Sequence, residues 1–217
     1  MSSEHRLFSI ETSPPWLTVV LPVPHRILSW ALNAPGYVTA QQVVWREVRN
    51  ADLPADLDAE VWLRKELDKA GLFGTPAMVT SRELEHVLVR QATVEDVVVE
   101  VVATVGLSNA ERVGARRAPL VFPVGTINLA VVVSPGLSDG AMLEAVSIAT
   151  EARTAAVIDH GPSIETGRAT GTGTDCIAVA APHGSLRYAG LHTALGEAIG
   201  LTVYDAISAG VRKWMRV

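Results

Sequence analysis

The stretches GTINLAVVVSP at residues 125–135 and GTDCIAVAAP at residues 173–182 both begin with Gly-Thr and both end in proline. Each leads into a long alanine-rich segment of helical character, at residues 138–159 and 191–214. A short apolar run bounded by turn residues is typical of a buried strand, and a helix that follows it covers the sheet. The sequence therefore predicts an internal strand–loop–helix repeat in the C-terminal half of an α/β (α+β) fold.

The N-terminal half contains further apolar runs, which predict more strands of a mixed sheet. Residues 16–22 and 26–32 are expected to form two strands, because the prolines between them cannot donate to a strand ladder. Residues 56–70 predict a helix, since apolar residues recur at helical spacing and Gly71 supplies a C-terminal stop. Further strands are predicted at residues 41–48, 76–81, 86–91 and 97–105. Since no linker divides the chain, residues 1–217 are expected to form a single domain.

The composition indicates an aliphatic core and a small-molecule partner. Of the 217 residues 48% are hydrophobic and only 5% aromatic, and no run reaches the roughly 20 apolar residues of a membrane helix. A net charge of −5 and a pI near 5.7 argue against nucleic acid as a partner. The opening residues MSSEHRLFSI lack an apolar stretch, so we expect no signal peptide, and the lone cysteine fits a reducing, cytoplasmic setting. The oligomeric state stays open, with a homo-oligomer as one alternative.

The segment ATGTGTDC, residues 169–176, places glycines and threonines directly before the second repeated strand. Backbone N–H groups of such a turn can approach an anion or a developing oxyanion. A phosphate-binding loop is disfavoured, because these glycines precede a strand and no lysine follows, whereas a P-loop opens a helix. Two alternatives stay open: a tight structural turn, or a set of oxyanion donors.

The helix predicted at residues 191–214 carries the clearest chemical signal. At about 100° per residue, one face gathers its polar and small residues: His192, Thr193, Gly196, Glu197, Gly200 and Tyr204. We expect His192 to lie in the first helical turn and to act as a general acid–base, with Glu197 orienting it or a water. The two glycines four residues apart indicate close approach of either another backbone or a ligand.

Two residues near the glycine-rich turn have competing interpretations. Cys176 lies in an apolar strand, so a buried core role is favoured over a nucleophile. Asp175 stands at the mouth of the same strand and needs a partner or solvent. A zinc site built from Asp175, His192, Glu197 and another histidine stays an alternative, but no H-x-x-x-H or H-E-x-x-H spacing supports it. The sequence therefore predicts neither a metal nor another protein cofactor.

Polar residues also recur at the margins of the other predicted strands. They are His25, Arg26, Asn33, Ser108, Asn109, Thr126 and Asn128. Each taken alone fits a turn residue or a surface charge. Because the placement repeats, we expect several of them to share one cleft.

Taken together, these segments resemble the adenosylcobinamide amidohydrolase family (CbiZ) of cobalamin salvage. The matching pieces are PHRILSWALNAPG, VGLSNAERVG, GTINLAVVVSP, ATGTGTDCIAVA and YAGLHTALGEAIGLTVYDAI, in order along nearly the whole chain. The resemblance implies hydrolysis of the amide that joins the corrin propionyl side chain to aminopropanol. The products would be adenosylcobyric acid and 1-amino-2-propanol, with cobalt arriving inside the corrinoid substrate.

Amide hydrolysis requires a nucleophile, a proton donor and oxyanion stabilisation, which we assign as hypotheses. The catalytic candidates are His192, Glu197, Asp175 and Thr174, with Thr174 or Ser108 as nucleophile if the route is covalent. The substrate-binding candidates are Asn33, Ser108, Asn109, Thr126, Asn128, Gly171, Thr172, Gly173 and Gly196. Two alternatives to this reaction remain: a non-catalytic corrinoid carrier, and an amidohydrolase that acts on other, complete corrinoids.

Overall fold

The computed structural model describes residues 6–54, 56–116 and 125–216. One mixed sheet of eight strands dominates the described part of the chain: β1 (Ser9–Ser13), β2 (Trp16–Ser29), β3 (Gly36–Glu47), β4 (Ala77–Thr80), β5 (Leu88–Val94), β6 (Val97–Val105), β8 (Ile127–Val133) and β12 (Cys176–Ala181). The strand order is β4-β3-β2-β12-β8-β6-β5, with β1 paired to β2. The helices are α1 (Ala59–Ala70), α2 (Asp139–His160) and α3 (Ala194–Trp214).

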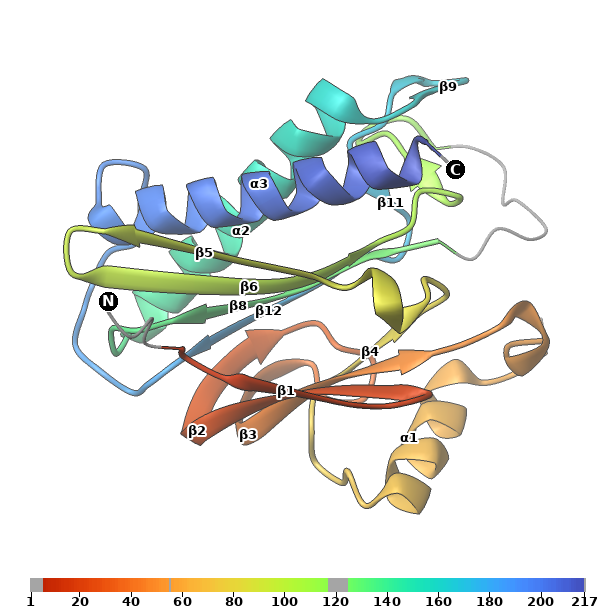
Figure 1. Ribbon diagram of the computed structural model, residues 1–217, viewed down its shortest axis with the longest axis horizontal. Helices are drawn as coiled ribbons and strands as arrows, with labels where there is room; N and C mark the ends of the chain where they lie inside the picture. Colours follow the sequence, from red (N-terminus) through yellow and green to blue (C-terminus); the bar gives the residue numbers. More distant parts are fainter. Residues whose placement is uncertain (1–5, 55, 117–124, 217) are drawn as a thin grey trace.

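Figure 1 shows α2 and α3 packed together over one face of the sheet, with α1 on the opposite side of the molecule near β3 and β4. Short antiparallel pairs complete the fold: β7 (Ala110–Glu111) with β11 (Gly171–Thr172), and β9 (Ser163–Ile164) with β10 (Gly167–Arg168). The predicted α+β class is confirmed. Within the described residues, no helix is long and apolar enough to cross a membrane.

The predicted internal repeat is confirmed by β8–α2 and β12–α3. The two strands are parallel neighbours, with Cys176 opposite Asn128 and Ala180 opposite Val132. Their exit loops cross closely, since a Cβ on Gly184 would lie 2.4 Å from the backbone of Gly136. A side chain at either position would push the loops apart, so these glycines let the two helices pack side by side.

The sheet has an apolar core on each face, because alternate residues of its central strands point to opposite sides. Ile177 and Val179 of β12 face α2 and α3, whereas Cys176, Ala178 and Ala180 face the N-terminal strands. The sheet curls around this second core until β4 approaches β8, where the side-chain amide of Asn128 donates to the Val79 carbonyl at 2.8 Å. The curl brings strands from both halves of the chain close together, since β4 belongs to the N-terminal half and β8 to the C-terminal half.

The expectation of two separate strands at residues 16–22 and 26–32 was wrong. Strand β2 is continuous from Trp16 to Ser29, and its register against β3 shifts between Val20 and His25. Pro22 and Pro24 lie within that shift, where a missing N–H interrupts no regular ladder. The strand can therefore bend at its prolines without ending.

The other predicted elements are confirmed with small changes in their bounds. Helix α1 ends at Ala70 and is followed by Gly71, whose φ of 70° is the left-handed conformation that glycine favours. The valine-rich β6 is buried despite Glu100, whose carboxylate is fully buried. It accepts hydrogen bonds from the Leu7 N–H at 2.6 Å and from Arg6 at 3.1 Å. This charge is compensated by the N-terminal segment, as a buried carboxylate requires.

Candidate functional site

A cavity of about 440 Å³ lies at the amino ends of β8 and β12, inside the curl of the sheet. Its lining comprises Trp30, Leu32, Val48, Leu53, Ala59, Trp62, Ala77, Met78, Val79, Ser81, Asn109, Gly125, Thr126, Asn128, Gly173, Thr174, Asp175 and Cys176. Cavities of roughly 300–1,000 Å³ with apolar walls and a few polar groups are typical of small-molecule sites. Six predicted site residues meet here: Asn109, Thr126, Asn128, Gly173, Thr174 and Asp175. Of the strand-margin residues expected to share one cleft, Asn109, Thr126 and Asn128 line this cavity, whereas His25, Arg26, Asn33 and Ser108 do not.

Hydroxyl and amide groups form the polar wall of the cavity. The Thr126 hydroxyl lies 2.8 Å from the Thr174 carbonyl oxygen and 3.3 Å from Oδ1 of Asn128. Thr174 is an exposed residue, and its hydroxyl lies 3.5 Å from the Gly125 carbonyl oxygen, at the long limit of a hydrogen bond. This wall therefore offers neutral hydrogen-bonding groups, which suit an uncharged polar ligand such as an amide.

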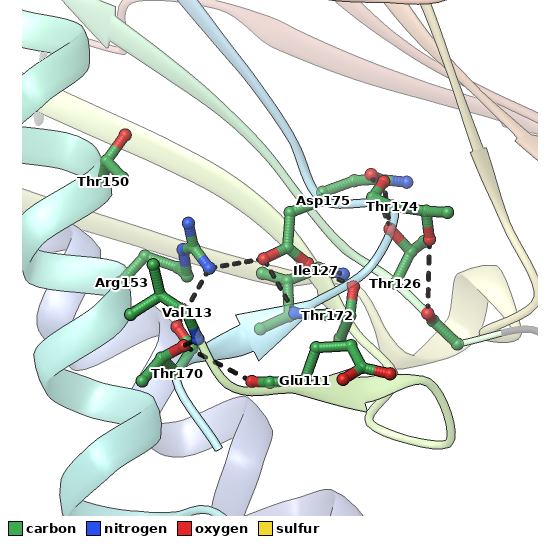
Figure 2. Close-up of polar contacts among 12 residues, drawn as sticks. Glu111, Val113, Thr126, Ile127, Thr150, Arg153, Thr170, Thr172, Thr174 and Asp175 are labelled. Carbon is green, nitrogen blue, oxygen red and sulfur yellow. Dashed lines mark hydrogen bonds and ion pairs between the residues drawn. The ribbon is translucent and has the colours of Figure 1, made fainter. Parts of the chain in front are cut away.

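Asp175 lies at the centre of a dense polar network, drawn in Figure 2. Its Oδ1 accepts from the Ile127 N–H at 3.0 Å and from the Thr172 hydroxyl. Its Oδ2 accepts from the Thr172 N–H at 3.0 Å and from Nη1 of Arg153 at 2.5 Å. Both side chains are nearly buried, with 7% of Asp175 and 11% of Arg153 exposed. The carboxylate thus ties the glycine-rich turn to β8 and α2, and its oxygens are already engaged by donors.

Arg153 was missed by the sequence reasoning, although Asp175 was expected to need a partner. It projects from α2, and its Nη1 also donates to the Thr170 carbonyl at 3.1 Å (Figure 2). The signal in the sequence was a lone arginine within the alanine-rich run EARTAAV, where a helix faces the sheet. Arginine is rarely buried unless it is paired, so a buried arginine in such a segment indicates a nearby carboxylate.

The glycines of the turn serve close packing around this network. A Cβ on Gly171 would lie 1.8 Å from Nη1 of Arg153, so glycine makes room for the ion pair. A Cβ on Gly173 would lie 3.0 Å from the Asn109 amide nitrogen. Gly173 also donates its N–H to the Asn109 carbonyl at 3.1 Å, which holds Asn109 at the cavity. The structural turn and the cavity wall are therefore the same segment.

Aromatic and aliphatic side chains form the remaining wall. Trp30 and Leu32, which follow the end of β2, are each 44% exposed, and Trp62 of α1 stands among the other apolar residues. The Trp30 indole N–H donates to the carbonyl of Asp175 at 2.6 Å, which fixes the ring at the cavity. Sequence reasoning did not single out these residues, because their position depends on the pairing of β2 with β12.

Cys176 is buried and also lines the cavity. Burial raises the pKa of its thiol to about 12, partly opposed by a hydrogen bond from the Trp30 backbone and reinforced by the charge of Asp175. The thiol therefore remains protonated near neutral pH and is a poor nucleophile. This agrees with the expected core role.

His192 and Glu197 lie elsewhere. The expected place of His192 in the first helical turn was wrong: it is exposed in the turn before α3, and Thr193 caps the helix by accepting from the Gly196 N–H at 3.0 Å. This turn follows the carboxyl end of β12, whereas the glycine-rich turn precedes the amino end (Figure 1). Neither His192 nor Glu197 lines the cavity, so these two catalytic candidates do not share it with the glycine-rich turn.

Three further candidates have structural surroundings outside the cavity lining. Gly196 packs on backbone, since a Cβ there would lie 2.2 Å from the Gly190 carbonyl oxygen. Asn33 donates to the Thr75 carbonyl at 2.9 Å and accepts from the Ala77 N–H at 3.0 Å, which supports the start of β4. Ser108 is exposed beside Gly125, where a Cβ would lie 2.7 Å from the Ser108 nitrogen.

The residues considered for zinc do not converge in the described part of the chain. Asp175 is engaged at the amino end of β12, whereas His192 and Glu197 are at the other end. The one group of ligand-type side chains found among the described residues is Glu83, Glu85 and His86, whose ligand atoms lie within 4.8 Å of one another. That group is largely exposed and does not line the cavity.

Comparison with known proteins matches residues 2–217 to the family described as CbiZ, adenosylcobinamide amidohydrolase. An adenosylcobinamide amidohydrolase of Methanosarcina mazei is 28% identical over 164 residues, covering 70% of this chain and 74% of that protein. An uncharacterized protein of Methanocaldococcus jannaschii is 37% identical over 91 residues, covering 39% of this chain and 34% of that protein. The chain thus spans about a third of the latter relative's length.

Proposed function

Because the chain belongs to the adenosylcobinamide amidohydrolase family, we propose that it hydrolyses the amide between the corrin propionyl side chain and aminopropanol of adenosylcobinamide. Water supplies the hydroxyl group that the carbonyl carbon gains, and the C–N bond breaks. The departing nitrogen takes the proton. The products are adenosylcobyric acid and 1-amino-2-propanol.

The observation that supports this reaction best is the cavity with amide and hydroxyl groups beside the glycine-rich turn. In our proposal, the cavity end of β12 binds the scissile amide. The Asn109 amide and the Thr174 hydroxyl are placed to contact its carbonyl or the attacking water. Asp175 is a positioning residue, since Arg153, Thr172 and Ile127 already occupy its oxygens. Neutral donors fixed around a developing oxyanion stabilise it without a further charge.

One observation favours a second function, a corrinoid-binding protein without catalysis. Among the described residues, the cavity lining contains no histidine, and its single carboxylate is held in an ion pair. A carrier would need the apolar and amide-bearing wall but no acid–base group. The sequence-based assignment of His192 and Glu197 to catalysis would require these residues to act from the other end of β12.

The two functions are separated by incubating the purified protein with adenosylcobinamide and assaying free 1-amino-2-propanol. We expect release of the amine that scales with protein concentration. Binding seen by visible spectroscopy without amine release would instead establish the carrier. A parallel incubation with a chelator tests metal dependence, and unchanged turnover there would show that no removable metal is needed.

A further inference from the structure

The cavity is graded from a buried end to an exposed mouth. Asn128 and Thr126, at 1% and 6% exposed, belong to the buried end together with Met78 at 2%. Trp30 and Leu32, each 44% exposed, belong to the mouth. A ligand that enters therefore places one end among buried amide and hydroxyl groups and leaves its other end beside an indole.

The size of the cavity limits what can enter. At about 440 Å³ it lies toward the small end of the roughly 300–1,000 Å³ of drug-sized sites. A corrin macrocycle with its adenosyl group and side chains needs far more room. The hydroxypropyl-amide arm of adenosylcobinamide is a short chain with an amide, a methyl and a hydroxyl group. The volume therefore fits the arm and leaves the ring outside.

Asn128 is the buried side chain best suited to recognise such an arm. Its amide donates one N–H to the Val79 carbonyl at 2.8 Å. Its Oδ1 lies 3.3 Å from the Thr126 hydroxyl, whose single proton is closer to the Thr174 carbonyl at 2.8 Å. An asparagine amide has two donor hydrogens and two acceptor lone pairs, so these contacts leave one N–H and acceptor capacity for a ligand. An amide or hydroxyl of the arm needs both.

We propose that the arm enters this cavity end-on, with Asn128 recognising its polar atoms at the buried end and Trp30 contacting the corrin ring at the mouth. This assignment rests on the proposed function. The Trp30 ring is held in place by its hydrogen bond to the Asp175 carbonyl, so one residue links the ring contact to the turn beside the scissile amide. Specificity for the arm and affinity for the ring are then carried by different residues.

The test compares a corrinoid that has the arm with one that lacks it. For adenosylcobinamide, kcat/KM is measured by amine release; for adenosylcobyric acid, the inhibition constant is measured in the same assay. Asn128→Leu, which keeps the side-chain size, should lower kcat/KM about tenfold or more, because it removes a buried polar partner, and should change the inhibition constant by less than about twofold. Trp30→Ala should lower kcat/KM for adenosylcobinamide and raise the inhibition constant of adenosylcobyric acid by similar factors.

Thr126→Val provides a second, milder change at the buried end, and thermal melting checks that each variant is folded. It should also act selectively on adenosylcobinamide. Equal weakening of both corrinoids by Asn128→Leu and Thr126→Val, or no effect of either, would overturn the proposal. If the unaltered protein releases no amine, the proposed hydrolysis fails instead. In that case, titration followed by visible spectroscopy still measures whether Asn128→Leu weakens binding of adenosylcobinamide more than binding of adenosylcobyric acid.

Discussion

Strand β12 has an arginine–aspartate pair near each end, with the same 2.5 Å separation and different surroundings. At the amino end, Arg153 and Asp175 are 11% and 7% exposed and hold the turn that borders the cavity. Near the carboxyl end, Arg26, opposite Ala181 of β12, meets Asp139, which is 75% exposed. The two pairs therefore have equal distances but different roles: one organises a buried polar network, and the other joins an arginine that is 20% exposed to an aspartate in solvent.

The amino end also combines its network with a cavity, whereas the carboxyl end combines its pair with a loop packed on glycines. Gly184 of the loop after β12 lies against Gly136 of the loop after β8, and Gly196 of α3 lies against the Gly190 carbonyl. Backbone approach explains the glycines there without a ligand. The amino end of β12 is thus the better candidate for the catalytic site, although His192, the predicted general acid–base, lies near the carboxyl end.

The largest difference is expected when each aspartate is removed. Asp175→Ala leaves Arg153 buried and uncompensated, so we expect a loss of about 3–5 kcal/mol in the free energy of unfolding. Asp139→Ala, the matched control at the other end, should cost about 0–1 kcal/mol because its charge is solvated. Urea unfolding measures both. Similar losses for the two variants would contradict the distinction between the ends.

The glycines of α3 provide the next test. Gly196→Ala places a methyl against backbone atoms that cannot rotate away, so a loss of about 1–3 kcal/mol or more is expected. Gly200, four residues on, has open space around its Cβ position. Gly200→Ala should therefore stabilise by up to about 1 kcal/mol through helix propensity. Thermal unfolding distinguishes a melting temperature that falls from one that rises.

Activity tests which end of β12 carries the reaction. Thr174→Val keeps the shape but removes the hydroxyl, and we expect kcat/KM for adenosylcobinamide to fall about tenfold or more. Thr174→Ser, which restores the hydroxyl, should recover most of the loss. His192→Ala should remain within about twofold of the unaltered protein, since an exposed residue far from the cavity adds little. If His192→Ala abolishes turnover while Thr174→Val does not, the sequence-based assignment of His192 is correct, that of Thr174 is wrong, and the cavity end is not catalytic.

The sequence predicted the elements well because their signals are local. The run of β-branched residues at Val97–Val105 and the repeat of β8–α2 with β12–α3 can be recognised without knowledge of distant contacts. The bend of β2 was missed, since prolines that end a regular ladder are tolerated at a register shift, and that shift depends on β3. Strand boundaries that depend on pairing with another strand are therefore hard to predict from the sequence.

The residues that line the cavity were predicted only in part, because some of them come from elements that are distant in the sequence. Three of the predicted site residues, Thr126, Asn128 and Thr174, line the same cavity because β8 and β12 are parallel neighbours. His192 was added to them because it shares a predicted helix face with Glu197 and Gly196. A helix that follows a strand begins at the strand's carboxyl end, so its start is separated from the strand's amino end by the strand's full length. Trp30 and Arg153 come from other elements, and only the curl of the sheet and the packing of α2 reveal them.

The smallest expected effect is a pH dependence of stability caused by Cys176, the first residue of β12. It tests whether solvent reaches the end of β12 that borders the cavity. Burial raises the pKa of its thiol to about 12, above the unfolded value near 9, so the stabilising effect is fully present below pH 9. As the pH rises from 9 toward 12, the unfolded chain loses this proton while the folded chain keeps it. Stability should then fall by up to about 1.4 kcal/mol per pH unit.

Urea unfolding at pH 8 and pH 10 should show this extra loss in the unaltered protein and not in Cys176→Ala. The same loss in both would mean that solvent reaches the thiol and that this end of β12 is wetter than its packing indicates.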